Sequence, residues 1–296
     1  MLILIHAGGY GRRLAPLTDY TPKPLLPIGN KALLDWIIEK LPPSPIFLST
    51  NRHFEKKFIK WGKDKGVRVF VEESFCEEDK PGAVGGLHIF IKENKIHEGI
   101  LLINGDNLFD FSLKDFKEED KIVNFVFEIM DPERIKGRLG NVMMKNGRII
   151  KFVEKPKEPI SPYISLGIYF FPPQIFPLIE EFLTSSLTDR DNLGSFLSWL
   201  IEKKNKPVIG KLVKGKWIDI GSRHSFLEAY RIFVGRSTFV DERAEVLNST
   251  LYHSVILGKS RIVNSELKGC IVDSANLENV RIENAIVGKG SDLRVK

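Results

Sequence analysis

The first hundred residues alternate short apolar runs with stretches of helical spacing, and this alternation constrains the fold more than any other feature. Apolar runs predict buried strands, whereas apolar residues three and four positions apart predict helices. The predicted strands are residues 2–6, 46–49, 67–71 and 100–103, and the predicted helices between them are 32–41, 53–63 and 84–92. Strands that alternate with helices form a mostly parallel, Rossmann-like α/β sheet with helices on both faces.

The middle of the chain predicts further strands at residues 122–129, 141–153 and 164–171. Asn146-Gly147 lies between apolar residues, and such a pair is a strong hairpin signal. Helices are predicted at 175–183 and 193–203, followed by edge strands at 208–212 and 216–220 and a closing helix at 222–233. These elements complete a first predicted domain, residues 1–235.

An internal repeat begins at about residue 237. Asn248-Ser249 is echoed by Asn264-Ser265 and then by Asn279, and aliphatic residues recur every five or six positions. This spacing predicts a β-solenoid in which each coil buries its inner face only against its neighbours. Residues 236–296 therefore form a second predicted domain. The open end of such a stack is an edge that needs a cover, so we expect a homo-oligomer through this repeat.

The composition of the chain limits the classes of ligand and cellular environment that we expect for it. The net charge of +6 arises from 44 Lys and Arg against 38 Asp and Glu with the signs interleaved, which disfavours a nucleic-acid surface and suits small polyanions. Cys76 and Cys270 have no metal-ligand spacing, so a reducing cytoplasm is expected. No apolar stretch is long enough for a membrane span. Gln174 is the only glutamine beside abundant Lys and Glu, a bias typical of thermophilic proteins.

The first strand leads into a glycine-rich loop, Gly8-Gly9-Tyr10-Gly11-Arg12-Arg13-Leu14-Ala15-Pro16-Leu17-Thr18, which continues to Thr21-Pro22-Lys23-Pro24-Leu25-Leu26-Pro27-Ile28. Glycines let backbone N–H groups approach phosphate oxygens, and Arg and Lys supply positive charge. Four prolines between residues 12 and 30 exclude a regular helix or central strand there, and a long loop in a compact domain is usually functional. A glycine-rich turn alone also fits an ordinary tight turn or a dinucleotide site.

A carboxylate follows another predicted strand. Asn104-Gly105-Asp106-Asn107 comes directly after residues 100–103, and ligands of such sheets bind beyond the carboxyl ends of the strands. Magnesium is usually held by one or two carboxylates together with substrate phosphates, so Asp106 is a candidate ligand. A Gly-Asp pair after a strand also fits a turn.

The loop as a whole resembles the signature of the sugar-phosphate nucleotidyltransferase family, GGxGxRLxPLT followed by PKPLLPI. The resemblance extends from Leu2 to about Phe233, and the repeat is similar to the left-handed parallel β-helix of many members. Lys216-Trp217-Ile218-Asp219-Ile220-Gly221 resembles the WxDIG motif, and Glu154-Lys155-Pro156 matches the EKP motif. The resemblance implies magnesium-dependent transfer of a nucleoside monophosphate from a nucleoside triphosphate to a hexose 1-phosphate, with release of pyrophosphate.

The resemblance also implies residue roles. The expected catalytic residues are Arg13, Lys23, Asp106, Lys155 and Asp219. The expected nucleotide-binding residues are Ala7, Gly8, Gly9, Gly11, Arg12, Arg13 and Gly82. The expected sugar-binding residues are Gly140, Glu154, Lys155 and Gly167. The expected Mg²⁺ ligands are Asp106 and Asp219, although Asp219 also fits a helix N-cap.

Three residues depart from the family pattern: Arg12 replaces the usual Thr or Ser, Leu139 a common Tyr, and Leu166 a frequent Thr or Ala. Gly105-Asp106-Asn107 favours dTTP or UTP with glucose 1-phosphate. Residues 82–86 and the repeat are also common in mannose-1-phosphate guanylyltransferases, so that substrate pair stays open. A regulatory subunit that binds nucleotide-sugar without turnover is a further alternative, whereas acyl transfer is disfavoured by the short repeat with His253 as its one histidine. The sequence leaves the base, the sugar, the oligomer size and any feedback inhibitor open.

Overall fold

The chain divides into two compact units. The computed structural model describes residues 1–185 and 192–295. One unit, called the sheet unit here, contains Met1–Gly8, Lys40–Gly105 and Phe111–Gly215. The other, called the β-helix unit, contains Gly9–Glu39, Asp106–Asp110 and Lys216–Lys296. The glycine-rich loop beyond Gly8 therefore belongs to the same unit as the C-terminal repeat.

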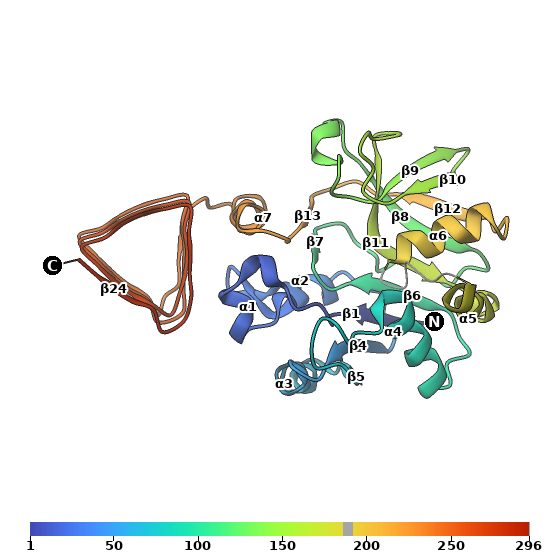
Figure 1. Ribbon diagram of the computed structural model, residues 1–296, viewed down its shortest axis with the longest axis horizontal. Helices are drawn as coiled ribbons and strands as arrows, with labels where there is room; N and C mark the ends of the chain where they lie inside the picture. The colour runs from blue at the N-terminus through green and yellow to red at the C-terminus, as the bar shows by residue number, and fades with distance from the viewer. Residues whose placement is uncertain (186–191, 296) are drawn as a thin grey trace. The chain divides into compact units, whose positions relative to one another are not determined.

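The sheet unit is built on one nine-stranded sheet (Figure 1). Its strands are, in spatial order, β5 (Arg68–Glu72), β4 (Ile46–Asn51), β1 (Leu2–His6), β6 (Ile100–Asn104), β11 (Tyr163–Phe171), β8 (Ile122–Glu128), β12 (Val208–Leu212), β10 (Arg148–Val153) and β9 (Asn141–Lys145). The first four are parallel, as predicted. β11 runs antiparallel to both of its neighbours, β6 and β8.

Helices cover both faces of this sheet, as expected from the alternation. Leu2 and Leu4 pack with Phe90 of α4 (Gly82–Glu93) in the main core. α5 (Phe176–Ser185) and α6 (Leu193–Glu202) contribute to the same core. α3 (Glu55–Lys65) packs on the opposite face, where a Cβ added to Gly62 would lie 3.0 Å from Val69 Cγ2. Because β1 is buried on both faces, its run is continuously apolar rather than alternating.

The β9–β10 hairpin confirms the prediction made from Asn146-Gly147. Both residues have positive φ angles, 51° and 72°, as a two-residue turn matched to the strand twist requires. The strand at 208–212 differs from the prediction, because β12 is not an edge strand but lies between β8 and β10. β12 pairs with β8 along its length, whereas β10 pairs only with Val208 and Ile209. The second half of β12 pairs with β8 alone and carries exposed residues such as Lys211, as an edge strand does.

The loop of residues 12–30 contains only short turns, as its prolines require. These are the 3-10 helices η1 (Arg12–Leu14) and η2 (Lys23–Leu25), the four-residue helix α1 (Leu17–Tyr20) and the strand pair β2 (Pro27–Ile28) and β3 (Lys31–Ala32). The helix α2 (Leu33–Ile38) follows, and it packs on β7 (Asn107–Phe109). β7 pairs with β13 (Trp217–Asp219) in a separate two-stranded sheet.

The predicted closing helix is α7 (Arg223–Ala229), which continues into the π-helix η5 (Tyr230–Val234). Tyr230 is fully buried, and its hydroxyl donates to the carbonyl of Pro27 at 2.9 Å. Its ring packs 5.0 Å from that of Phe239 at the start of the repeat. Tyr230 therefore joins the glycine-rich segment, the closing helix and the repeat.

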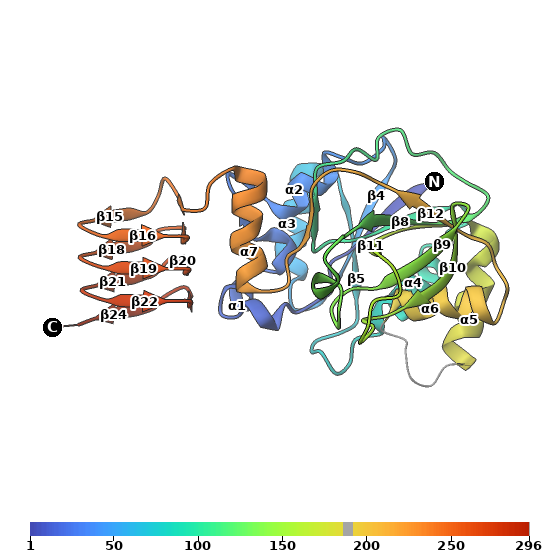
Figure 2. The same ribbon diagram turned by 90° about the horizontal axis from the view of Figure 1, so that it is seen from above.

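The repeat is a parallel β-helix of triangular cross-section, as Figure 1 shows, with its coils stacked in Figure 2. Its strands are β14 (Phe239–Val240), β15 (Glu245–Leu247), β16 (Thr250–Tyr252), β17 (Val255–Leu257), β18 (Arg261–Val263), β19 (Glu266–Lys268), β20 (Ile271–Asp273), β21 (Asn276–Glu278), β22 (Arg281–Glu283), β23 (Ile286–Val287) and β24 (Asp292–Arg294). They form three parallel sheets, and the inward residues include Ile256, Ile262, Leu267, Val272 and Leu277. Their spacing of five or six residues confirms the predicted solenoid.

No helix within residues 1–185 and 192–295 combines the length and the apolar character that crossing a bilayer requires.

The buried hydroxyl of Tyr230 gives a test of this scaffold. Tyr230→Phe keeps the ring but leaves the Pro27 carbonyl without its donor, so we expect a loss of about 1–2 kcal/mol in the free energy of unfolding. Urea denaturation measures this loss. Tyr252→Phe is the matched control, because Tyr252 is 56% exposed, and it should change stability little. A Tyr230→Phe protein as stable as the control would contradict a structural role for this hydrogen bond.

Candidate active site

The pairing of β7 with β13 brings Asp106 and Asp219 together. Asp219 lies opposite Asn107 in this antiparallel pair, and Ile220 N donates to the carbonyl of Asp106 at 3.2 Å. Asn107 Nδ2 donates to Asp106 Oδ1 at 3.0 Å, while Asn107 Oδ1 accepts from Trp217 Nε1 at 3.1 Å. Two predicted metal ligands, far apart in sequence, thus stand at adjacent strand ends.

Lys23 lies against both carboxylates. Its Nζ is 2.7 Å from Asp106 Oδ2 and 3.7 Å from Asp219 Oδ1, and its side chain is 10% exposed. The lysine stands at the start of η2, in the turn-rich segment that the prolines impose. A nearly buried ammonium needs such partners, because burying an unpaired charge costs several kcal/mol.

Arg13 completes the group. A Cβ added to Gly221 would lie 2.8 Å from Arg13 Nη2, so the guanidinium lies against the backbone just beyond Asp219. The charge of Arg13 favours the ionised form of Asp219. The structure therefore brings together four of the five predicted catalytic residues, all in the β-helix unit. We call Arg13, Lys23, Asp106 and Asp219 the charge cluster.

Asp219 is electrostatically strained within this cluster. Burial raises the pKa of its carboxyl group, and the negative charge of Asp106 raises it further, against the opposing effects of Lys23 and Arg13. Among the described residues, no hydrogen-bond donor reaches its buried Oδ1 atom. This oxygen is thus an acceptor whose protein surroundings leave it incompletely satisfied.

The predicted nucleotide-binding residues are divided between the two units. Ala7 N donates to the carbonyl of Ser49 at 2.8 Å, and Asn51 Nδ2 donates to the carbonyl of Gly8 at 2.8 Å. Gly9 has nothing within 4 Å of an added Cβ, which leaves open space beside the backbone. Gly11 has φ +66°, and an added Cβ would lie 2.9 Å from Thr18 Cγ2. Two further predicted residues are the exposed Arg12 and, at the first position of α4, Gly82.

Sequence reasoning missed Glu72. The hydroxyl of Ser49 donates to Glu72 Oε1 in a short hydrogen bond. A Cβ added to Gly86 would lie 2.7 Å from Oε1, and one added to Gly8 would lie 3.6 Å from Oε2. Burial raises the pKa of Glu72, partly offset by the Ser49 hydrogen bond. Glu72 ends β5, so the strand-end argument that identified Asp106 could have identified it too.

The predicted sugar-binding residues gather in the sheet unit. Glu154 Oε2 would lie 3.1 Å from a Cβ added to Gly140 and 2.8 Å from one added to Gly194, in the first turn of α6. Lys155 has the rare positive φ of 44°, and its exposed Nζ is 3.6 Å from Glu154 Oε1. Negative charge at a helix N-terminus is stabilising, so α6 supports the Glu154 carboxylate. Sequence reasoning also missed Gly194.

Gly167 makes close contact with a strand-end side chain. Its φ is +68°, and an added Cβ would lie 2.5 Å from Asn104 Nδ2. Two strand positions away, the hydroxyl of Tyr169 accepts from Ser165 Oγ at 3.2 Å. Burial raises the pKa of Tyr169, and the charge of Glu154 adds to this shift. Leu166, one of the departures from the family pattern, is 1% exposed and packs into the core.

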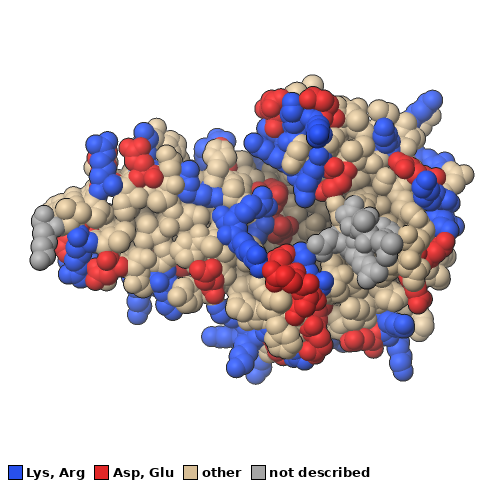
Figure 3. Space-filling model, viewed as in Figure 1, with Lys and Arg blue, Asp and Glu red and all other residues tan. Residues whose placement is uncertain are grey.

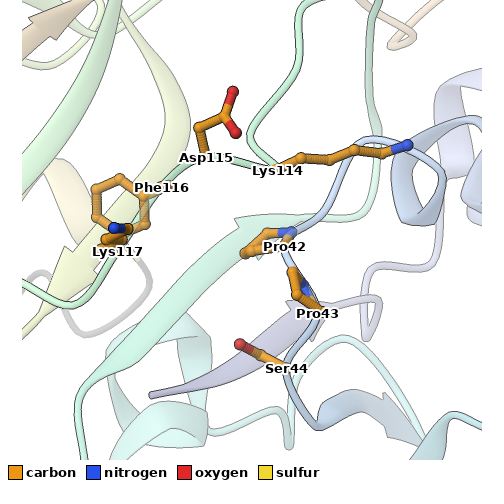
Figure 4. Close-up of a pocket in the computed structure, with 7 residues that line it drawn as sticks. All are labelled: Pro42, Pro43, Ser44, Lys114, Asp115, Phe116 and Lys117. Carbon is orange, nitrogen blue, oxygen red and sulfur yellow. The ribbon is translucent and has the colours of Figure 1, made fainter.

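A separate hollow of about 540 Å³ occurs on the sheet unit (Figure 4). Its lining residues are Pro42, Pro43, Ser44, Lys114, Asp115, Phe116 and Lys117. The proline pair precedes β4, so the hollow lies near the amino end of that strand. None of the predicted site residues lines it, and we do not assign it to the candidate site.

Comparisons with known proteins agree with these features. The family model described as nucleotidyl transferase matches residues 2–233. The bifunctional protein GlmU of Methanocaldococcus jannaschii is 31% identical over 79% of this chain and 54% of its own length. Mannose-1-phosphate guanylyltransferase 1 of Arabidopsis thaliana is 26% identical over 100% of this chain and 83% of its own.

A solved structure from Bacillus anthracis, described as a putative glucose-1-phosphate thymidylyltransferase in complex with a sucrose, shares the fold. Its TM-score is 0.66 at 24% identity, over 78% of this chain and 94% of that chain. The chain spans about half the length of the GlmU relatives that it matches. Because the family model covers most of the chain, and a relative above 30% identity matches the same region, the chain belongs to the nucleotidyl transferase family.

Proposed function

We propose that this protein transfers a nucleoside monophosphate from a nucleoside triphosphate to a hexose 1-phosphate and releases pyrophosphate. The charge cluster is the observation that carries this proposal. Two cations and two carboxylates converge beside a glycine-rich loop, and this arrangement suits a reaction between two anions. In this proposal residues 1–235 carry catalysis and residues 236–296 serve assembly and support.

The proposed chemistry needs no general base. The second pKa of a phosphate monoester is about 6, so the attacking sugar-phosphate oxygen is largely ionised at neutral pH. It attacks the α-phosphorus in line, a new O–P bond forms, and the bond to the bridging oxygen breaks as pyrophosphate leaves with the electron pair. The main barrier is repulsion between anions, which fixed cations reduce most in a site of low effective dielectric.

Different residues are proposed to bind the triphosphate and the sugar phosphate. Arg13 and Lys23 are proposed to neutralise the triphosphate, while Ala7, Gly8, Gly9, Gly11, Arg12 and Gly82 contribute to its binding. Lys155 is proposed to hold the sugar phosphate, and Glu154 to accept hydrogen bonds from sugar hydroxyls beside Gly140 and Gly167. The support for these roles is the contact between Lys23 and both carboxylates, and the packing of Glu154 against Gly140 and Gly194.

The donor set fits magnesium. Mg²⁺ prefers oxygen ligands and is usually held by one or two carboxylates plus substrate phosphates. Asp106 and Asp219 supply such oxygens, and the unsatisfied Oδ1 of Asp219 is suited to a cation. Within residues 1–185 and 192–295 no three His, Cys, Asp or Glu side chains are grouped as a metal site. Mg²⁺ held by two carboxylates would complete its coordination with waters and substrate phosphates. When bound, the ion would neutralise phosphate charge.

A second copy of the chain is the proposed partner of the β-helix. Figure 3 shows the end that carries the chain terminus as a mostly uncharged surface with charged side chains at its rim. Leu293 and Val295 on the last coil are 44% and 58% exposed. β24 is the last strand of its sheet, so its outer edge can accept a neighbour.

Two classes of triphosphate remain candidates. The Gly105-Asp106-Asn107 motif favours dTTP or UTP with glucose 1-phosphate. Glu72 favours GTP, with mannose 1-phosphate as the alternative substrate, because guanine presents two adjacent N–H donors that one carboxylate can accept together. Uracil and thymine present one N–H between two carbonyl oxygens, which a carboxylate repels. The contacts of Glu72 with Gly8 and near Gly86 support its placement beside a nucleotide.

The proposed activity is tested with a matrix of nucleoside triphosphates against hexose 1-phosphates, with pyrophosphate release as the readout. At least one pair should give turnover that requires Mg²⁺. Asp106→Ala should reduce kcat by about 10²–10³-fold or more, because it removes a group that organises transition-state charge. Asp115→Ala, an exposed carboxylate outside the cluster, is the control and should retain activity. Nucleotide-sugar binding without turnover in every pair would instead favour a regulatory subunit.

The base preference is tested with Glu72→Gln. If guanine is the base, the variant should lose about 5–150-fold in kcat/KM for GTP, the range of one bidentate base contact. Its kcat/KM for dTTP and UTP should stay the same or rise. Glu73→Gln is the neighbouring control, because Glu73 pairs with Arg52 at the surface. Wild-type preference for dTTP or UTP, unaffected by Glu72→Gln, would remove Glu72 from base recognition.

The raised pKa of Asp219 predicts that replacing this carboxylate increases stability and reduces activity. Since the folded-state pKa of Asp219 is raised, the folded protein binds more protons than the unfolded chain just above the ordinary Asp pKa of about 3.9. Stability therefore falls as pH rises through this window, and the cost persists at neutral pH. Asp219→Asn should melt at a higher temperature than wild type at pH 7 in chelator, and should lose at least about 100-fold in turnover.

The same comparison near pH 3 provides the control, because Asp219 is then protonated in both states and the melting temperatures should converge. A variant less stable than wild type at pH 7 would show that attraction to Lys23 and Arg13 outweighs the cost of burial.

A further inference from the structure

The last full turn of the β-helix touches the loop that carries Arg13 and Lys23. A Cβ added to Gly288 would lie 2.8 Å from Pro16 Cβ and closer still to Pro16 Cγ. Non-bonded carbon atoms stand about 3.5–4.0 Å apart, so the Gly288 backbone lies directly against the proline ring. The next residue, Lys289, places Nζ 5.9 Å from the ring centroid of Tyr20, within cation–π range. All four residues belong to the β-helix unit.

The β-helix side of this contact is firmly held. Gly288 follows Val287, which is 7% exposed and part of the β-helix core. Gly290 N donates to the carbonyl of Ser274 on the preceding coil at 3.1 Å, and Ser291 N donates to the carbonyl of Gly288 at 3.2 Å. The turn is therefore held just before the contact by the buried Val287 and just beyond it by the bond of Gly290 to the preceding coil.

The loop side leads directly to the charge cluster. Pro16 joins η1, which holds Arg13, to α1. Thr18, 2% exposed in α1, donates to the carbonyl of Gly11 at 3.0 Å. A Cβ at Gly11 would meet Thr18 Cγ2 at 2.9 Å and Lys23 Cβ at 3.4 Å, so these three residues are tightly packed. A displacement of Pro16 therefore reaches Gly11 and Lys23 through Thr18.

We propose that Gly288 and Lys289 are positioning residues: the turn they form is a strut that holds the loop of Arg13 and Lys23 in its reactive geometry. This inference rests on the nucleotidyl transfer proposed above. The strut is distinct from two further attachments of the β-helix: the packing of Phe239 on Tyr230, and the hydrogen bond that Arg223 Nη1 of α7 donates to the carbonyl of Gly269. The β-helix thereby takes part in catalysis without contacting the substrate.

The experiment introduces a single methyl group at the contact. Gly288→Ala should lower kcat/KM for the nucleoside triphosphate by about 10–100-fold, because an ångström-scale displacement of positioning groups has effects of this size. The KM for hexose 1-phosphate, assigned to the Glu154 group in the sheet unit, should not change. Amide hydrogen exchange should accelerate in residues 12–21.

Gly290→Ala is the matched control. It lies in the same turn, where nothing stands within 4 Å of an added Cβ, and its φ of +83° imposes backbone strain without the Pro16 contact. It should keep wild-type kinetics and loop exchange. Lys289→Ala is a milder second variant, expected to lose about two- to fivefold in kcat/KM for the triphosphate, and it replaces Gly288→Ala if that variant does not fold.

Equal kinetics and equal loop exchange in Gly288→Ala and Gly290→Ala would overturn the strut. Lost turnover without faster exchange in residues 12–21 would overturn it as well, and so would wild-type behaviour of Lys289→Ala if Gly288→Ala does not fold. If the wild-type protein shows no turnover with any substrate pair, that result would instead contradict the proposed reaction. In that case the comparison of loop exchange still decides whether the strut exists.

Discussion

One buried ammonium shared by two carboxylates is the interaction on which the site depends. Lys23 stands 2.7 Å from Asp106 and 3.7 Å from Asp219, so it keeps two like charges together without a hydrogen bond to every oxygen. Without that cation, the carboxylates would repel each other across the β7–β13 pair. Asn107 donates a hydrogen bond to Asp106 and accepts one from Trp217, and these two bonds hold the Asp106 carboxylate in place. In the proposed reaction, a triphosphate with a divalent cation would add charges of both signs to this cluster.

The raised pKa of Asp219 predicts that this cluster lowers stability, and the scaffold around it is tightly packed. The raised pKa of Asp219 shows that its surroundings disfavour the charged form. The packing nearby is correspondingly strong: Tyr230 is fully buried and bonded to Pro27, and the β-helix core is continuous from coil to coil. Functional sites commonly break local rules that the rest of a fold obeys. Here the violation is one unsatisfied carboxylate oxygen.

Local patterns were enough to predict much of this molecule. The parallel strands, the Asn146-Gly147 hairpin and the five-residue spacing of the solenoid all depend on neighbours in sequence, and the structure confirms them. The prediction that residues 208–212 form an edge strand was wrong, because the exposure of the second half of β12 depends on how far β10 extends. Glu72 and Gly194 were missed because their importance lies in contacts across the sheet unit. Asp106 was found from its strand end, whereas Asp219 was found only through a family motif, since spacing alone cannot place Asp219 beside Asp106.

The contact of Gly288 with Pro16 belongs to the same class of information, because no local pattern relates a turn of the repeat to the first loop of the chain. Because of this contact, the repeat is not a separate appendage but is packed against the loop of residues 12–30. The residues assigned to triphosphate charge lie in one compact unit with the β-helix, whereas Glu154 and Lys155 lie in the other unit. A partner bound at the end of the β-helix would therefore act on the same unit that carries Arg13 and Lys23. Because packed cores transmit strain, the proposed assembly and the proposed reaction would be coupled at the contact of Gly288 with Pro16.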